Sequence, residues 1–144
     1  MRKSRTSPSV SVGGPECYES RDLPQGVTTS KVPLPPMSTY VLGLLLRAPN
    51  RAEISDAEAE EIQEGHLAHI NRMRERGDLI VAGPLLDDGN LRGILIFRTS
   101  SVDQVQHWTE GDPAIQQHRL VLELHQLFAP AGLQVIPPPP GSPA

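Results

Sequence analysis

The sequence is poor in aromatic residues, in cysteine and in long apolar runs. Its 144 residues include one Trp, two Tyr, two Phe and a single cysteine, Cys17. So few aromatic side chains leave no stacking platform for single-stranded nucleic acid. One cysteine cannot form an intramolecular disulfide framework, and this fits a reducing, cytoplasmic compartment. No run approaches the roughly 18 apolar residues of a membrane-spanning helix, and the basic start lacks the apolar segment of a secretory signal.

The two ends of the chain differ in composition from the middle. Residues 1–36 contain six Pro and nine Ser or Thr, and we expect a disordered leader there because little apolar surface offsets the entropy of ordering. The proline-rich residues 137–144 are expected to form a disordered tail. A single domain is therefore predicted over residues 37–136. Met37 opens that domain, so it is a candidate for the native translation start.

Charge is divided in the same way. Residues 1–36 hold five Lys or Arg and three Asp or Glu, whereas residues 37–144 hold eight and fourteen, a net charge of −6. An acidic domain argues against a nucleic-acid partner, because binding to the phosphate backbone requires clustered Lys and Arg.

Hydrophobic periodicity predicts six elements in the order strand, helix, strand, strand, helix, strand. Their expected positions are residues 38–47, 55–76, 78–84, 91–97, 102–110 and 119–126. Ser55 or Asp56 can cap the long helix and Gly77 can end it, while Ser101 and Gln104 form a capping-box pattern for the second helix. "DPAIQQH" can begin one more helical turn, with Asp112 as its cap.

Two helical crossovers around a hairpin predict an α+β, ferredoxin-like βαββαβ fold with an antiparallel four-stranded sheet. Two helices cover only one face of such a sheet, yet three of the strands are apolar at consecutive positions, as strands buried on both faces are. We therefore expect a second copy of the chain to cover the other face, which makes a homodimer the predicted assembly.

The segment "EGHLAHI", residues 64–70, places a histidine in the apolar stripe of the long helix. With Ile62 at zero and about 100° per residue, the buried stripe is predicted to include Ala59 near 60° and Leu67 near 140°. His66 falls near 40°, well inside that stripe, and His69 near −20°, at its margin. His66 is therefore either a core histidine or a histidine that lines a pocket and acts as an acid or base. His69 is interpreted as a rim residue.

Other candidate residues have structural explanations beside functional ones. The two histidines lack the third and fourth ligands that zinc requires, so no metal is expected. Asp112 caps a helical turn but can also orient an imidazole. Arg92 and Arg98 are either solvated or hold a substrate carboxylate. A strand end accounts for Gly83-Pro84, and a close approach within the sheet accounts for Gly93. A turn accounts for Asp87 and Asp88.

Taken in order, these residues resemble the YCII-related family of small bacterial proteins between Tyr40 and about Leu133. The matching features are His66-Leu67-Ala68, Gly77, Ala82-Gly83-Pro84, the Asp-Gly turn with Gly93, Trp108 and Asp112-Pro113. The resemblance implies a ferredoxin-like dimeric α/β barrel with an active site built on a histidine and an aspartate. By motif these are His66 and Asp112. A related member removes chloride from a chlorinated muconolactone, and the wider superfamily includes lactone isomerases and small monooxygenases.

The first functional hypothesis is a cofactor-free enzyme of lyase or isomerase type. Asp112 would orient His66 for acid–base chemistry on a small carbonyl or lactone-type substrate. Gly83, Pro84, Arg92 and His69 are the candidates for the substrate pocket. The alternatives are a non-catalytic dimer that binds a small ligand or a protein, and a cofactor-free monooxygenase.

Overall fold

The structure, a computed structural model, describes residues 32–143. Most of the predicted leader, including Cys17, lies outside these residues. The described chain divides into two compact units, residues 40–126 with 134–143 and residues 32–39 with 127–133. In the second unit the backbone N–H of Ala131 donates to the carbonyl of Pro36 at 2.8 Å. Residues 134–143 of the first unit form no helix or strand.

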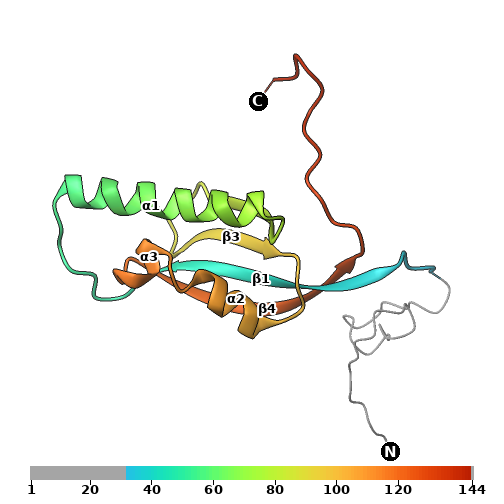
Figure 1. The fold of residues 1–144 in the computed structure, drawn as a ribbon, viewed down its shortest axis with the longest axis horizontal. Coiled ribbons are helices and arrows are strands. Elements are labelled where there is room, and N and C mark those ends of the chain that lie inside the picture. The colour runs from blue at the N-terminus through green and yellow to red at the C-terminus, as the bar shows by residue number, and fades with distance from the viewer. Residues whose placement is uncertain (1–31, 144) are drawn as a thin grey trace, which may run out of the picture. The chain divides into compact units, whose positions relative to one another are not determined.

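The elements follow the predicted order, with a short third helix before the last strand (Figure 1). They are β1 (Met37–Arg47), α1 (Asp56–Glu75), β2 (Leu79–Pro84), β3 (Leu91–Phe97), α2 (Val102–Thr109), α3 (Pro113–Gln116) and β4 (Leu120–Pro130). The four strands form one sheet in the order β2-β3-β1-β4. This is the antiparallel α+β arrangement of the ferredoxin-like fold, so the predicted fold class is confirmed. Strand β4 continues to Pro130, beyond the predicted end at residue 126.

Strand β3 lies between β1 and β2 and pairs antiparallel with both. Its partners run from Val41↔Phe97 to Leu46↔Leu91 on β1, with a register shift between Leu45 and Leu46. Near the hairpin, Pro84 of β2 pairs with Gly93 of β3. A Cβ on Gly93 would lie 2.9 Å from the carbonyl oxygen of Gly83. Glycine is therefore required for this close approach, as the sequence suggested.

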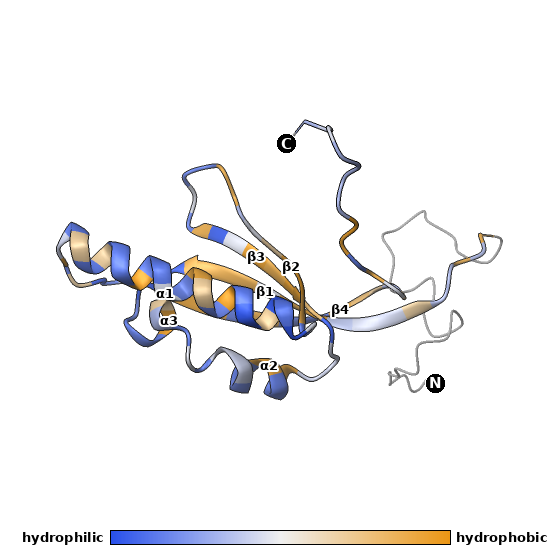
Figure 2. Cartoon of the chain, turned by 45° about the horizontal axis from the view of Figure 1, so that its top comes forward, coloured by the Kyte–Doolittle hydropathy of each residue, from blue (hydrophilic) through white to orange (hydrophobic). Residues whose placement is uncertain are grey.

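The hydrophobic core lies between one face of the sheet and helices α1 and α2. Its buried members are Val41, Leu45, Met73, Leu79, Leu95, Phe97 and Val105. Trp108 of α2 packs against Phe97, with ring centroids 6.3 Å apart. Leu120, Leu122 and Leu124 of β4 also pack on this core, while Val121, Glu123 and His125 are exposed. The alternation predicted for this strand is thus observed. Figure 2 shows the hydrophobic strands beside a largely hydrophilic α1.

The helix caps follow the sequence closely, with one difference. Ser55 and Glu58 form a full capping box at the start of α1, and Gly77 follows its end with a positive φ of 85°. At α2, the Ser101 side chain accepts from the backbone N–H of Gln104. The second bond of a capping box, from the backbone N–H of Ser101 to the Gln104 side chain, is absent from the described contacts of α2. The Gln104 side-chain oxygen instead accepts from the Thr99 hydroxyl at 2.7 Å.

The second face of the sheet carries a row of apolar side chains. Leu42, Leu44 and Leu46 of β1 and Ile94 and Ile96 of β3 are half-buried. They alternate along the strands with core residues, and none of the five belongs to the described core. The apolar surface that led us to expect a partner is therefore present on this face.

Candidate active site

His66 lies midway along α1 and is one of the two buried residues of that helix, with 6% of its surface exposed. Sequence periodicity placed it on the inward side, and this is confirmed. Its Nδ1 lies 2.8 Å from Oδ2 and 3.0 Å from Oδ1 of Asp112. Because a carboxylate oxygen only accepts, the imidazole donates its Nδ1–H to Asp112. No described residue hydrogen-bonds to Nε2.

Asp112 is 3% exposed and begins the short helix α3. Its Oδ1 accepts from the backbone N–H of Ala114 at 2.9 Å, so the carboxylate is the helix cap that the sequence predicted. The same carboxylate therefore holds α3 and contacts His66. Two bonds from different elements fix its position, and this fixes the orientation of the imidazole in turn.

Gly65 lets α3 approach α1 closely beside this pair. A Cβ at position 65 would lie 2.8 Å from Cγ of Pro113, the residue after Asp112. Glycine inside a helix lowers its stability by about 1 kcal/mol relative to alanine. Sequence reasoning did not single out Gly65, although a glycine in mid-helix next to the candidate histidine was the available signal.

A cavity of about 620 Å³ opens between α1 and the sheet, and His66 lines it. Its lining residues from α1 are Ala59, Ile62, Gln63, His66, Leu67, Ile70, Asn71 and Arg74. The prediction of a buried stripe is wrong for two of these residues. Ala59 is exposed, and Leu67 is 50% exposed. The angular pattern was correct, but along this part of the helix the stripe faces a cavity instead of packed side chains.

Three of the four pocket candidates line this cavity, namely Gly83, Pro84 and Arg92. His69 is not among the lining residues. Its Nε2–H donates to the backbone carbonyl of Trp108 at 2.9 Å and so connects α1 to α2. Arg98 is also outside the cavity lining, and its Nε–H donates to the carbonyl of Gly77. Asp87 and Asp88 lie exposed in the loop between β2 and β3.

Arginine side chains from four separate segments line one part of the cavity. They are Arg47, Arg51, Arg92 and Arg119, here called the arginine cluster. Arg74 of α1 also lines the cavity, whereas no Asp or Glu among the described residues does. Desolvation lowers the pKa of the Arg51 guanidinium from its ordinary value, and the positive charges of Arg119, Arg47 and Arg92 lower it further. Only Arg92 was expected from the sequence.

Within residues 32–143 no group of three or more His, Cys, Asp and Glu side chains is placed to hold a metal ion. Helix α1, the longest of the described helices, and its two neighbours are too short or too polar to span a membrane.

The fold and the site define a small ferredoxin-like α+β protein with a buried histidine–aspartate pair beside a cavity. The sequence model of the YCII-related domain matches residues 42–124, more than half of the 144 residues. The chain therefore belongs to the YCII-related family, and the predicted membership is confirmed.

Comparison with curated proteins finds no match. Among solved structures, the chain is similar to a 5-chloro-2-hydroxyhydroquinone dehydrochlorinase, TftG, from Burkholderia phenoliruptrix AC1100, in complex with 2,5-dihydroxybenzoquinone. The two chains share 21% sequence identity with a TM-score of 0.45, and the match covers 60% of this chain and 90% of the other.

Proposed function

We propose that the chain is a small cofactor-free enzyme in which His66 acts as general acid and base on a small carbonyl or lactone-type substrate. The reaction is of the lyase or isomerase type. The observation that carries this proposal is the double contact of His66 Nδ1 with the Asp112 carboxylate, at 2.8 and 3.0 Å, on a histidine that lines a cavity. The cavity volume of about 620 Å³ lies in the range of small-molecule sites.

The tautomer that Asp112 selects is the one that a base requires. With the hydrogen on Nδ1, the neutral ring carries its lone pair on Nε2, which has no hydrogen-bond partner among residues 32–143. The ring becomes positive when Nε2 takes a proton, and the adjacent carboxylate stabilises that charge. Asp112 is thus a positioning residue, and His66 is the proposed catalytic residue.

The proposed reaction begins when Nε2 removes a proton from the carbon next to the substrate carbonyl. The electrons of the broken C–H bond move onto the carbonyl oxygen and give an enolate. In a lyase, the electrons return and expel a leaving group from the neighbouring carbon. In an isomerase, the substrate has a C=C bond adjacent to the deprotonated carbon, so the anion is a dienolate and His66 returns the proton at its far carbon as the double bond shifts.

Deuterium exchange in D₂O tests the first step without knowledge of the full reaction. Lactones and carbonyl compounds are incubated with the protein, and loss of the proton signal next to the carbonyl is followed by NMR. His66→Gln keeps an amide that can donate to Asp112 but has no basic nitrogen, so we expect exchange to fall about 10²- to 10⁴-fold. Asp112→Asn is expected to slow exchange as well, because its amide favours the wrong tautomer.

The matched control is His107→Gln, an exposed histidine of α2 that does not line the cavity. It should exchange substrate at the wild-type rate. Exchange that survives His66→Gln in a folded protein would remove the proposed role. Compounds that bind without any exchange would instead favour the non-catalytic binding module.

We propose further that the protein forms a homodimer through the second face of its sheet. The proposal is supported by five half-buried apolar side chains on this face, because contiguous apolar surface often marks an interface. They are Leu42, Leu44, Leu46, Ile94 and Ile96. Light scattering of the full chain should give twice the monomer mass, and Leu44→Glu should shift the protein to monomer. A monomeric wild-type protein at micromolar concentration would refute this assembly.

A further inference from the structure

The arginine cluster is built from segments that the backbone holds together at one end of the sheet. The N–H of Arg47 donates to the carbonyl of Asn90 at 2.9 Å, beside the start of β3. The N–H of Ala48 donates to the carbonyl of Arg119 at 3.1 Å. The Arg119 guanidinium then donates to the carbonyl of Ala52 at 2.7 Å, next to Arg51. The four arginines are therefore brought together by two main-chain hydrogen bonds and one hydrogen bond from the Arg119 side chain.

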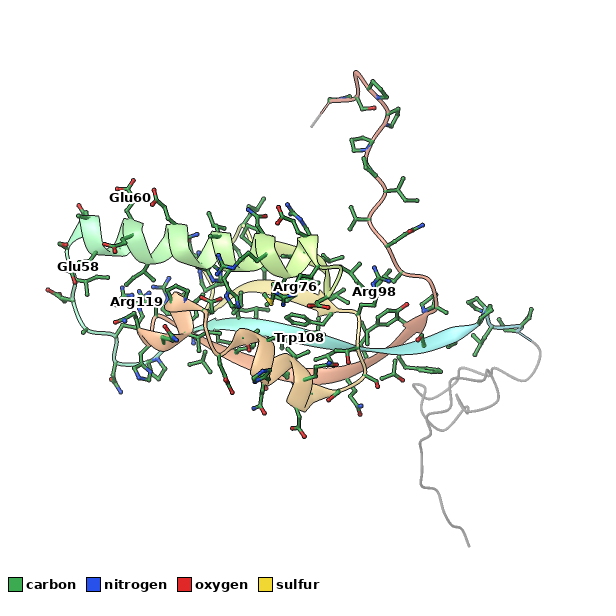
Figure 3. All side chains as sticks on the ribbon, in the orientation of Figure 1. Glu58, Glu60, Arg76, Arg98, Trp108 and Arg119 are labelled. Atoms are coloured by element: carbon green, nitrogen blue, oxygen red, sulfur yellow. The ribbon has the colours of Figure 1, made fainter. Side chains whose placement is uncertain are left out.

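None of the four guanidinium groups has a carboxylate partner within residues 32–143. Arg92 donates only to the backbone carbonyls of Asp87 and Gly89, and Arg119 only to that of Ala52. Arg47 and Arg51 have no side-chain hydrogen bond in the described chain. In Figure 3 Glu60 points outward from α1, and Arg119 lies beside α3.

Gathering like charges at a cavity costs free energy. The pKa of the Arg51 guanidinium is lowered first by desolvation and then by the positive charges of Arg119, Arg47 and Arg92. In a domain with net negative charge, unpaired arginines at a cavity are best explained by an anion that binds there. Guanidinium groups bind carboxylate and phosphate oxygens in a bidentate manner. Four of them are enough to neutralise more than one negative charge.

We propose that the arginine cluster binds a dianionic oxyanion portion of the substrate, either two carboxylates or a phosphate group, while His66 acts on the carbonyl portion. The inference rests on the proposed function and adds the charge class of the substrate. His66 and the arginine cluster line the same cavity, so one substrate can contact both. The oxygens of the anion replace the missing carboxylate partners of Arg47 and Arg51. The cluster thereby fixes which carbon of the substrate faces Nε2.

Isothermal titration calorimetry of the full chain with succinate and with inorganic phosphate tests the proposal. Succinamide, the neutral analogue of succinate, is the ligand control. We expect both anions to bind at low salt, succinamide not to bind, and affinity to fall as salt is raised, since screening weakens exposed charges. Higher affinity for succinate supports a dicarboxylate substrate, and higher affinity for phosphate supports a phosphate ester.

Arg47→Gln and Arg51→Gln are the informative variants, because neither side chain makes a hydrogen bond in residues 32–143 whose loss would disturb the fold. Each should weaken anion binding about 10- to 100-fold, the effect of losing one hydrogen bond to a charged group. Arg72→Gln is the matched control, since Arg72 lies on α1 but does not line the cavity. It should bind as the wild type does.

The inference is overturned if neither anion binds, if succinamide binds as well as succinate, or if both cluster variants bind like the wild type. Its failure is distinguishable from failure of the proposed function through His66→Gln, which should keep anion binding within about threefold. Exchange of a neutral carbonyl compound without anion binding would preserve the role of His66 alone. Arginine-dependent anion binding without any exchange would preserve only the anion site.

Discussion

Replacing Gly65 with alanine tests whether close packing of α1 and α3 sets the His66–Asp112 contact. The new Cβ would lie 2.8 Å from Cγ of Pro113, and reaching an ordinary carbon–carbon separation requires a shift of about 0.6 Å or more. Pro113 follows Asp112 directly, so a shift along the same direction would lengthen the contact from 2.8 Å to about 3.4 Å, near the limit for a hydrogen bond.

The expected effects on stability and on activity differ in size. Alanine favours the helix by about 1 kcal/mol, whereas overpacking costs about 1–3 kcal/mol, so unfolding free energy should fall by about 0–2 kcal/mol. That loss lowers the melting temperature by several degrees at most. Exchange of the substrate proton should fall about tenfold or more, because sub-ångström misplacement of an acid–base group is costly.

Thermal unfolding and the D₂O exchange assay measure the two quantities separately. Pro113→Ala removes the clashing ring atom, so the double variant with Gly65→Ala should recover most of the exchange rate. A Gly65→Ala protein that melts higher and exchanges substrate at the full rate would refute the reasoning. Packing of α3 on α1 would then not determine the geometry of the pair.

Three further changes follow from the same contacts. Asp112→Ala removes a helix cap and leaves the buried Nδ1–H of His66 without an acceptor. Urea unfolding should show that the free energy of unfolding falls by about 2–4 kcal/mol. A decrease below about 1 kcal/mol would contradict the geometry of the pair. Gly93→Ala places a Cβ 2.9 Å from the backbone oxygen of Gly83, and we expect about 1–3 kcal/mol of destabilisation by the same measurement, whereas an unchanged midpoint would argue against that close approach. Ser55→Ala breaks the capping box of α1 and should cost about 0.5–2 kcal/mol, read from the thermal midpoint, and a neutral outcome would show that the box does not stabilise the helix.

Local sequence signals were sufficient for most of the fold. Caps and periodicity located α1 to within one residue, and alternation oriented β4, because both depend on neighbours in the sequence. The capping box expected at Ser101 failed in part, since Thr99 competes for the side chain of Gln104. Such competition is decided by the backbone path before the helix, which the sequence pattern does not specify.

The site was accessible from sequence only in part. Helical geometry predicted that His66 faces inward. Its pairing with Asp112 was predicted only from the resemblance to a family, because 46 residues separate the two in the sequence. The arginine cluster had no local signal, since its members come together only through strand pairing and loop contacts. Leu67 was expected in the core because a helical pattern cannot distinguish a packed neighbour from a cavity.

The two ends of α1 are packed unequally, although the cavity runs along both. Met73 is buried in the core near the C-terminal end, whereas near the other end Ala59 and Gln63 are exposed and Ile62 is half-buried. A segment with few buried apolar contacts opens at a lower free energy than one anchored in a core. Amide hydrogens in the first two turns of α1 should therefore exchange faster than those around Met73, and ligand binding should slow them. The helix that carries the proposed base is thus packed more firmly around Met73 than near its start.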